Sequence, residues 1–142
     1  MNPTAVKFGY PDSVVKRFEH WLVQVRPAQP TLGSLVLVCT DPAASFGGIS
    51  AEAGRELPHA TAEIERVLGA AFGFEKINYL MLMMVDPDVH FHVLPRYPSD
   101  KSYAGQAFVD ATWPGPPDVT AANPFDDAVK AELTADLKTR FG

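Results

Sequence analysis

The stretch that decides the fold is Asp86-Pro87-Asp88-Val89-His90-Phe91-His92-Val93-Leu94-Pro95-Arg96-Tyr97. Polar and apolar residues alternate strictly through its middle, which is typical of a β-strand with two unlike faces. We expect the apolar members to face a hydrophobic core: Val89, Phe91 and Val93. The polar members should stand in a row on the opposite face, with neighbours roughly 7 Å apart from the rise of a strand: Asp88, His90 and His92.

That row of polar side chains is the candidate functional site. It holds two of the chain's four histidines, His90 and His92. A solvated strand face with two surface histidines is the plainest interpretation, but such faces more often carry Thr, Lys or Glu. Imidazoles in register suit proton or phosphoryl transfer, or metal ligation.

Composition limits the class of protein. The chain has 142 residues, of which 46% are hydrophobic and 20% charged, as in one globular domain with a sizeable core. A net charge of -5 argues against a nucleic-acid partner, which requires a basic face, but allows a single nucleotide as ligand. The single cysteine, Cys39, indicates a reducing compartment. With no apolar signal region and no apolar run of about 18 residues, we expect a cytoplasmic protein without a membrane partner.

The residues before residue 86 predict strands around one long helix. Residues 1–12 are expected to be irregular, residues 13–26 to form two short paired strands, and residues 35–39 to form a central strand with both faces covered. Residues 75–85 are rich in aliphatic side chains and methionine, which predicts a second buried strand.

The long helix is predicted from its caps and its apolar spacing. Ser50 is the expected N-cap and Gly73 the C-terminal stop. Pro58 either kinks this helix or marks the start of its regular part. The apolar residues that recur at intervals of three and four form its buried stripe: Leu57, Ala60, Ile64, Val67, Leu68, Ala71 and Phe72.

After Tyr97 we expect a polar loop and then a last helix. Residues 113–117 should form a rigid, extended segment that lies over the body of the domain and serves as a lid or a dimer contact. Asn123 and Pro124 are the expected N-cap and first residue of the helix. Its buried seam is spaced by four: Phe125, Val129, Leu133, Leu137 and Phe141. The whole predicts an α+β fold, a small antiparallel sheet with helices on one face.

Three kinds of chemistry remain open for the histidine strand. One is nucleophilic attack of an imidazole on phosphorus, which needs a neutral histidine with its other nitrogen held in place. Another is a metal site of Asp88, His90 and His92 with a fourth ligand from His20, His59 or Asp86, although side chains on one flat strand diverge, and no HExxH or CxxC motif is present. The third is a non-catalytic nucleotide-binding module that uses the same face.

The residues His90-Phe91-His92-Val93-Leu94-Pro95-Arg96 resemble the signature of the histidine triad (HIT) superfamily, in which alternate histidines are often followed by Pro-Arg. Residues 21–26, 32–38 and the helix ending near Phe72 follow that family's order, as does the strand at Ile77 and Asn78. The resemblance covers about residues 13–97 and is greatest to a bacterial branch of the superfamily.

This resemblance implies an antiparallel sheet of about five strands, one long helix and a C-terminal helix, in a single domain of residues 1–142 with its core in 13–97 and a C-terminal loop and helix in 98–142. It implies a homodimer and a nucleotide hydrolase or nucleotidyltransferase. Such an enzyme attacks the α-phosphate of a dinucleoside polyphosphate or nucleoside phosphoramidate through a covalent nucleotidyl-histidine. His90 matches the nucleophile and His92 the histidine that contacts the phosphate. No metal or other cofactor is expected.

The chain departs from the family pattern in three places. Asp88 replaces the first histidine of the triad, and Ser34 replaces a frequent histidine after Pro-Gly. The resemblance places these two positions close together. Residues 82–87 are short and mostly apolar where the family has a polar, phosphate-binding loop.

Five side chains complete the expected site and its surroundings. Asp88 and Asn78 are the candidate substrate contacts, with Asn78 as a replacement donor to phosphate. Arg96 is expected to form salt bridges rather than to bind substrate. His20 and His59 are expected to be structural or surface residues.

Overall fold

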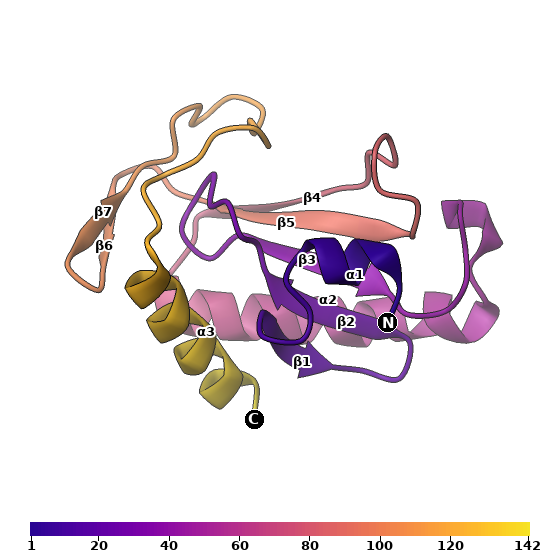
Figure 1. The fold of residues 1–142 in the computed structure, drawn as a ribbon. Helices are drawn as coiled ribbons and strands as arrows, with labels where there is room; N and C mark the ends of the chain where they lie inside the picture. The colour runs from indigo at the N-terminus through magenta and orange to yellow at the C-terminus, as the bar shows by residue number, and fades with distance from the viewer.

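The computed structural model describes residues 1–142 (Figure 1). A 3-10 turn, η1, spans Phe46–Gly48. The three helices are α1 (Pro3–Lys7), α2 (Ala51–Phe72) and α3 (Asp127–Phe141). The strands are β1 (Val14–Arg17), β2 (Trp21–Val25), β3 (Leu35–Cys39), β4 (Lys76–Leu80), β5 (His90–Arg96), β6 (Lys101–Tyr103) and β7 (Gln106–Phe108).

The first five strands form one antiparallel sheet in the order β1-β2-β3-β5-β4. This confirms the expected α+β fold and its five-stranded sheet. Every residue of β3 is buried, as a central strand requires. Strand β5 lies between β3 and the edge strand β4, so the histidines sit inside the sheet and not at its rim.

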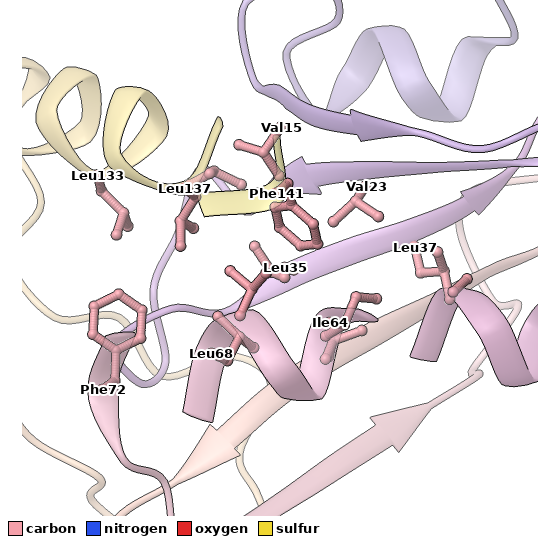
Figure 2. Packing of buried hydrophobic residues seen from close by; sticks show 14 of the residues in the cluster. Val15, Val23, Leu35, Leu37, Ile64, Leu68, Phe72, Leu133, Leu137 and Phe141 are labelled. Carbon is pink, nitrogen blue, oxygen red and sulfur yellow. The ribbon is translucent and has the colours of Figure 1, made fainter. Parts of the chain in front are cut away.

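The main core lies between one face of the sheet and helices α2 and α3. In Figure 2 side chains of β1, β2 and β3 point toward apolar side chains of both helices. Helix α2 begins after Ser50, whose side chain accepts a hydrogen bond from the Ala53 N–H, and ends at Gly73, whose φ of 62° favours glycine. The helix continues through Pro58, so a start at that residue is wrong.

The opposite face of the sheet is covered by α1, which contradicts the expectations that residues 1–12 are irregular and that helices lie on one face only. The short helix crosses in front of the sheet while α2 runs behind it (Figure 1). Asn2 caps α1 by accepting from the Ala5 N–H, and Pro3 occupies its first turn. A second, smaller apolar cluster lies beneath it: Ala5, Phe8, Val14, Leu22, Val36 and Val38.

Strand β4 is shorter and more exposed than expected. It ends at Leu80, and the following residues form a loop in which Met84 is 85% and Val85 81% exposed. An edge strand has no neighbour to bury its outer side, so an apolar composition alone does not bury this segment. The predicted strand is therefore confirmed at Lys76–Leu80, while its burial and its extension to residue 85 are wrong.

The C-terminal third contains two further differences. The expected polar loop includes the hairpin β6–β7, whose two-residue turn, Ala104-Gly105, has positive φ at both residues, as a tight hairpin requires. Helix α3 begins after the cap Asp126 and not at Asn123, whose amide instead donates to the carbonyls of Gln29, Pro30 and Val109. The buried seam is confirmed at Val129, Leu133, Leu137 and Phe141. None of the helices is both long and apolar enough to cross a membrane.

Candidate functional site

The two histidines lie in the middle of the sheet, on the face that α1 covers. His90 pairs with Val38 of β3, and His92 lies between Val36 of β3 and Leu80 of β4. Alternation along β5 turns both imidazoles to the same face, and their ring centroids are 5.1 Å apart. The strand thus brings the two predicted histidines together, as expected.

His90 is held in one orientation by its own chain. Its Nδ1 lies 2.7 Å from the backbone carbonyl oxygen of Asp88. A carbonyl oxygen can only accept, so the neutral ring carries its proton on Nδ1 and its lone pair on Nε2. A nucleophilic imidazole requires this arrangement.

His92 is held neutral by its surroundings. Burial, with smaller contributions from Arg26 and His90, lowers the pKa of His92 to about 4. The side chain is only 7% exposed, and its buried Nδ1 has no hydrogen-bond partner. An unsatisfied buried nitrogen is uncommon in folded proteins, because it is costly unless a ligand uses it.

The ring of Phe8 covers both imidazoles. Its centroid lies 6.1 Å from that of His90 and 5.9 Å from that of His92, with the latter pair edge to face. His90 is consequently only 2% exposed. None of the four principal cavities is lined by either histidine.

Asp88 lies outside the strand, which begins at His90, so the row of three polar side chains predicted on one strand contains only two. Its carboxylate accepts from the Thr4 N–H at 3.2 Å, and its own N–H donates to Thr4 Oγ1 at 3.1 Å. Nearby, Lys7 Nζ lies 2.8 Å from a carboxylate oxygen of Asp86. The side chain at the first triad position therefore contacts the N-terminal helix, while its backbone carbonyl holds His90.

Asn78 lies toward the other end of β5, at the level of Leu94. Its Oδ1 accepts from Arg96 Nη1 at 2.9 Å, so its side chain meets the guanidinium and not the imidazoles. Both residues border a cavity of about 480 Å³ beneath the segment Trp113–Pro117. This segment lies against the sheet, where Arg96 donates to the Gly115 carbonyl, but residues 111–115 form turns and not the extended segment that the sequence predicts.

Arg96 forms the expected salt bridge, which joins Nε to Asp110 Oδ2 at 2.7 Å with both side chains buried. Its Nη2 also donates to Asp110 Oδ1, Thr112 Oγ1 and the Gly115 carbonyl. Although burial raises the pKa of the Asp110 carboxyl, hydrogen bonds from Arg96 and from the Tyr97 N–H hold it below its ordinary value.

Ser34 and Asp88 do not lie close together, which corrects that expectation. Strands β3 and β5 run antiparallel with Leu35 opposite Val93, and the Cys39 N–H donates to the Val89 carbonyl. Ser34 precedes one end of this ladder and Asp88 precedes the other. The buried Ser34 hydroxyl instead donates to the Thr31 carbonyl in the turn before β3.

The two remaining histidines have structural or surface positions, as expected. His20 Nδ1 lies 2.8 Å from Asp41 Oδ2, and this hydrogen bond raises the pKa of His20. The exposed His59 packs edge to face on Phe18. Nowhere in the chain do three or more His, Cys, Asp or Glu side chains meet as a metal site would require.

The sequence interpretation missed the residues that cover the site, Thr4, Lys7 and Phe8, and the partner of Arg96, Asp110. A signal for the first group was present, because Asn2 followed by Pro3 is a common start of a helix. Asp110 has no comparable signal, since nothing in a loop sequence indicates which buried cation it will reach.

Comparison with solved structures shows the fold that these elements form. The chain superposes on a histidine triad protein from Bradyrhizobium japonicum with a TM-score of 0.76 and 18% identity, covering 100% of this chain and 97% of the other. A hypothetical histidine triad nucleotide-binding protein from Sulfolobus tokodaii gives 0.70 and 11%, covering 97% and 89%. A Zn-bound histidine triad family protein from Mycobacterium smegmatis gives 0.65 and 14%, also covering 97% and 89%.

The chain therefore has the histidine triad fold. No family model matches its sequence, and no curated protein matches it. At identities below 20% the superpositions establish the architecture, while the chemistry rests on the side chains.

Proposed function

We propose that the chain is a histidine triad hydrolase or nucleotidyltransferase that acts at the α-phosphate of a nucleotide conjugate, a dinucleoside polyphosphate or a nucleoside phosphoramidate. The observation that carries the proposal is the hydrogen bond between His90 Nδ1 and the Asp88 carbonyl oxygen, because it leaves a lone pair on Nε2. A structural neighbour described as a nucleotide-binding protein supports the class of ligand.

In the proposed reaction Nε2 of His90 attacks the α-phosphorus. An N–P bond forms, the bond from phosphorus to the leaving group breaks, and the leaving group takes up a proton from solvent, which the attacking water or alcohol returns in the second step. The positive charge on the phosphorylated imidazole is stabilised by the Nδ1–H···O=C hydrogen bond to Asp88. Water, or an acceptor alcohol in a transferase, then attacks phosphorus, breaks the N–P bond and restores His90.

His92 is proposed to contact the phosphate. Its ring is neutral, so it can be buried without the cost of burying a charge. Its Nδ1 has no hydrogen-bond partner and is free to bind a ligand. Asn78 and Asp88 remain the proposed contacts to the rest of the substrate. Asp88 reaches substrate only after it has released the Thr4 N–H.

The remaining expectations stay part of this proposal: a cytoplasmic homodimer with the HIT domain in residues 1–142, which takes a nucleotide and neither a nucleic acid nor a membrane as its partner. Edge strand β4 is the sheet edge next to the histidine strand, and pairing of two such edges would give a continuous sheet.

A non-catalytic nucleotide-binding module is the second candidate. The observation that favours it is the apolar loop over residues 81–85, which offers no side-chain donors to a phosphate where the family has a polar loop. Such a module would use the same face of the sheet without a covalent step.

A nucleotide panel read by intact mass distinguishes these candidates. The enzyme should gain the mass of a nucleotidyl group, and His90→Ala should lose it, while the exposed His59→Ala serves as matched control and retains it. If no adduct and no turnover occur with any member of the panel while nucleotides still raise the melting temperature, the binding module replaces the enzyme. If neither response occurs, both proposals are wrong.

A further inference from the structure

The proposed nucleophile is almost entirely covered in this structure. His90 is 2% and His92 7% exposed, and the ring that covers them belongs to the chain itself. A phosphate group that approaches Nε2 of His90 has to enter a space beside Phe8. The site therefore needs a conformational change before it can bind substrate.

The cover is held by the apolar cluster that contains Ala5 and Phe8, by a hydrogen bond from Gln24 Nε2 to the Ala5 carbonyl, and by contacts of its polar side chains. Thr4 and Asp88 exchange two hydrogen bonds, one through each backbone N–H. Lys7 pairs with Asp86, and Asn2 Nδ2 donates to the Cys39 carbonyl at 3.0 Å. Three of these five hydrogen bonds and ion pairs therefore involve Asp86 or Asp88, immediately before the histidine strand.

The covering segment is built as a small unit on the outside of the sheet. Helix α1 has five residues, which is too short to be stable alone. Its outer face is solvated, with Val6 55% exposed. Directly after Phe8, Gly9 has a φ of 96°, a conformation that favours glycine and makes this residue a suitable hinge.

We propose that residues 2–8 are a lid that must open before a nucleotide conjugate reaches His90, and that Asp88 is the latch residue that keeps it closed. This inference rests on the proposed function for the identity of the substrate. It assigns the Asp88 side chain a gating role at the position where the family has a histidine. A carboxylate suits this role, because both of its oxygens accept hydrogen bonds and one of them takes the Thr4 N–H.

A closed lid has two chemical consequences. It leaves little room beside His90 for solvent in the absence of substrate. It also reduces the apparent affinity of every ligand, because part of the binding free energy has to offset the cost of opening. Small phosphates, which make few contacts, offset that cost less easily than a nucleotide conjugate. The lid thereby selects for large substrates.

Carbethoxylation of histidine by diethyl pyrocarbonate, followed by peptide mass analysis, measures the opening without any nucleotide. The reagent requires the Nε2 lone pair and access to it, and the exposed His59 provides an internal reference. In the wild type we expect His90 to react at less than about one-tenth of the rate of His59, since only the open population reacts.

Three variants loosen the latch in different ways. Asp88→Ala removes the acceptor for Thr4, Thr4→Val removes the hydroxyl that accepts from Asp88 N–H while keeping the side-chain shape, and Lys7→Met removes the pair to Asp86. Each should raise the rate ratio of His90 to His59, by about tenfold for Asp88→Ala, which loses a hydrogen bond to a charged group. Asp88→Asn keeps an acceptor oxygen and should restore most of the protection.

Thr134→Val is the matched control. Thr134 is also buried and also uses its hydroxyl in a hydrogen bond, to the Lys130 carbonyl, but it lies on α3 and makes no hydrogen bond to residues 2–8. Its rate ratio should equal that of the wild type. If Asp88→Ala fails to fold, Thr4→Val and Lys7→Met carry the test.

Two results overturn the lid: a wild-type His90 that reacts as fast as His59, or folded latch variants whose ratio stays at the wild-type value. Failure of the lid proposal can be distinguished from failure of the proposed function, because the reactivity of His90 is measured without nucleotide. The rate of adduct formation by Thr4→Val then tests whether the lid gates catalysis. If it does, this variant forms the nucleotidyl adduct faster than the wild type. An unchanged or slower rate shows that lid opening does not limit the reaction.

Discussion

The two ends of strand β5 differ in whether their buried polar groups have hydrogen-bond partners. At the Arg96 end the guanidinium donates to Asp110, Asn78, Thr112 and the Gly115 carbonyl. At the His92 end a ring nitrogen is buried with no hydrogen-bond partner. Both ends are covered by chain segments that lie far from them in sequence.

The difference separates a structural site from a functional one. A charge that is buried and fully hydrogen-bonded fixes the segment after Tyr97 on the sheet, and leaves little for a ligand to gain. An imidazole that is buried without a hydrogen-bond partner lowers the stability of the fold. Proteins keep such a group where a ligand supplies the missing hydrogen bond. Four measurements test this difference between the Arg96 end and the histidine end.

The largest effect is expected when the Arg96 end loses its carboxylate. Asp110→Ala leaves a buried guanidinium without its counter-charge, which should lower the free energy of unfolding by about 3–5 kcal/mol. Urea denaturation measures it. Glu52→Ala is the matched control, because Glu52 also pairs with an arginine, Arg55, but with both side chains exposed; a loss there of no more than about 1 kcal/mol is expected. Similar losses in both variants would show that the Arg96 end is not special.

The His92 end should make stability depend on pH. Its folded-state pKa of about 4 lies below the value of about 6.5 in an unfolded chain, so between these values only the unfolded state binds the proton. The contribution of neutral His92 to the free energy of unfolding is therefore fully present above about pH 6.5 and is lost as the pH falls toward 4. The shift corresponds to about 3 kcal/mol.

Urea denaturation at pH 7 and at pH 4.5 tests this for the wild type and His92→Asn. The loss between the two pH values should be smaller in His92→Asn, because the titrating ring is gone. His59→Asn removes an exposed histidine and should lose as much as the wild type. An equal loss in all three proteins would mean that His92 is not held neutral by burial.

The sheet and the histidine pair could be predicted because both rest on local patterns. Alternation along residues 88–93 places His90 and His92 on one face whatever lies above them, and the continuous apolar run at 35–39 requires a central strand. What covers that face could not be derived in the same way. Phe8 is one aromatic residue in a short N-terminal segment, and its contact with β5 is decided by tertiary packing across more than 80 residues of chain.

Other failures have equally physical reasons. The β6–β7 hairpin turns on Ala104-Gly105, which is weaker than the Asn-Gly signal of such turns because alanine rarely takes a positive φ. Asn123 has the composition of a cap, but its amide is used by three carbonyls of distant loops. The prediction of a buried strand at 81–85 failed because composition does not show where a sheet ends.

A smaller effect, with opposite signs at neighbouring residues, is expected from removing each imidazole. His92→Leu removes a buried nitrogen that has no partner and should raise the free energy of unfolding at pH 7 by about 1 kcal/mol. His90→Leu removes the donor to the Asp88 carbonyl and should lower it by about the same amount. Thermal or urea unfolding at one pH compares the two, and a stabilising His90→Leu would contradict the assigned hydrogen bond.

The smallest effect is expected from Thr112→Val at the Arg96 end. Nη2 of Arg96 donates to Thr112 and also to Asp110 and the Gly115 carbonyl, so loss of one acceptor leaves the guanidinium bonded. We expect a loss of about 0.5–1 kcal/mol in urea denaturation. Thr139→Val removes an exposed helical hydroxyl and should change stability by less. A loss as large as that of Asp110→Ala would mean that the acceptors of Arg96 act as one unit. The presence of several acceptors would then no longer distinguish this end of β5 from the histidine end, where Nδ1 of His92 has no partner.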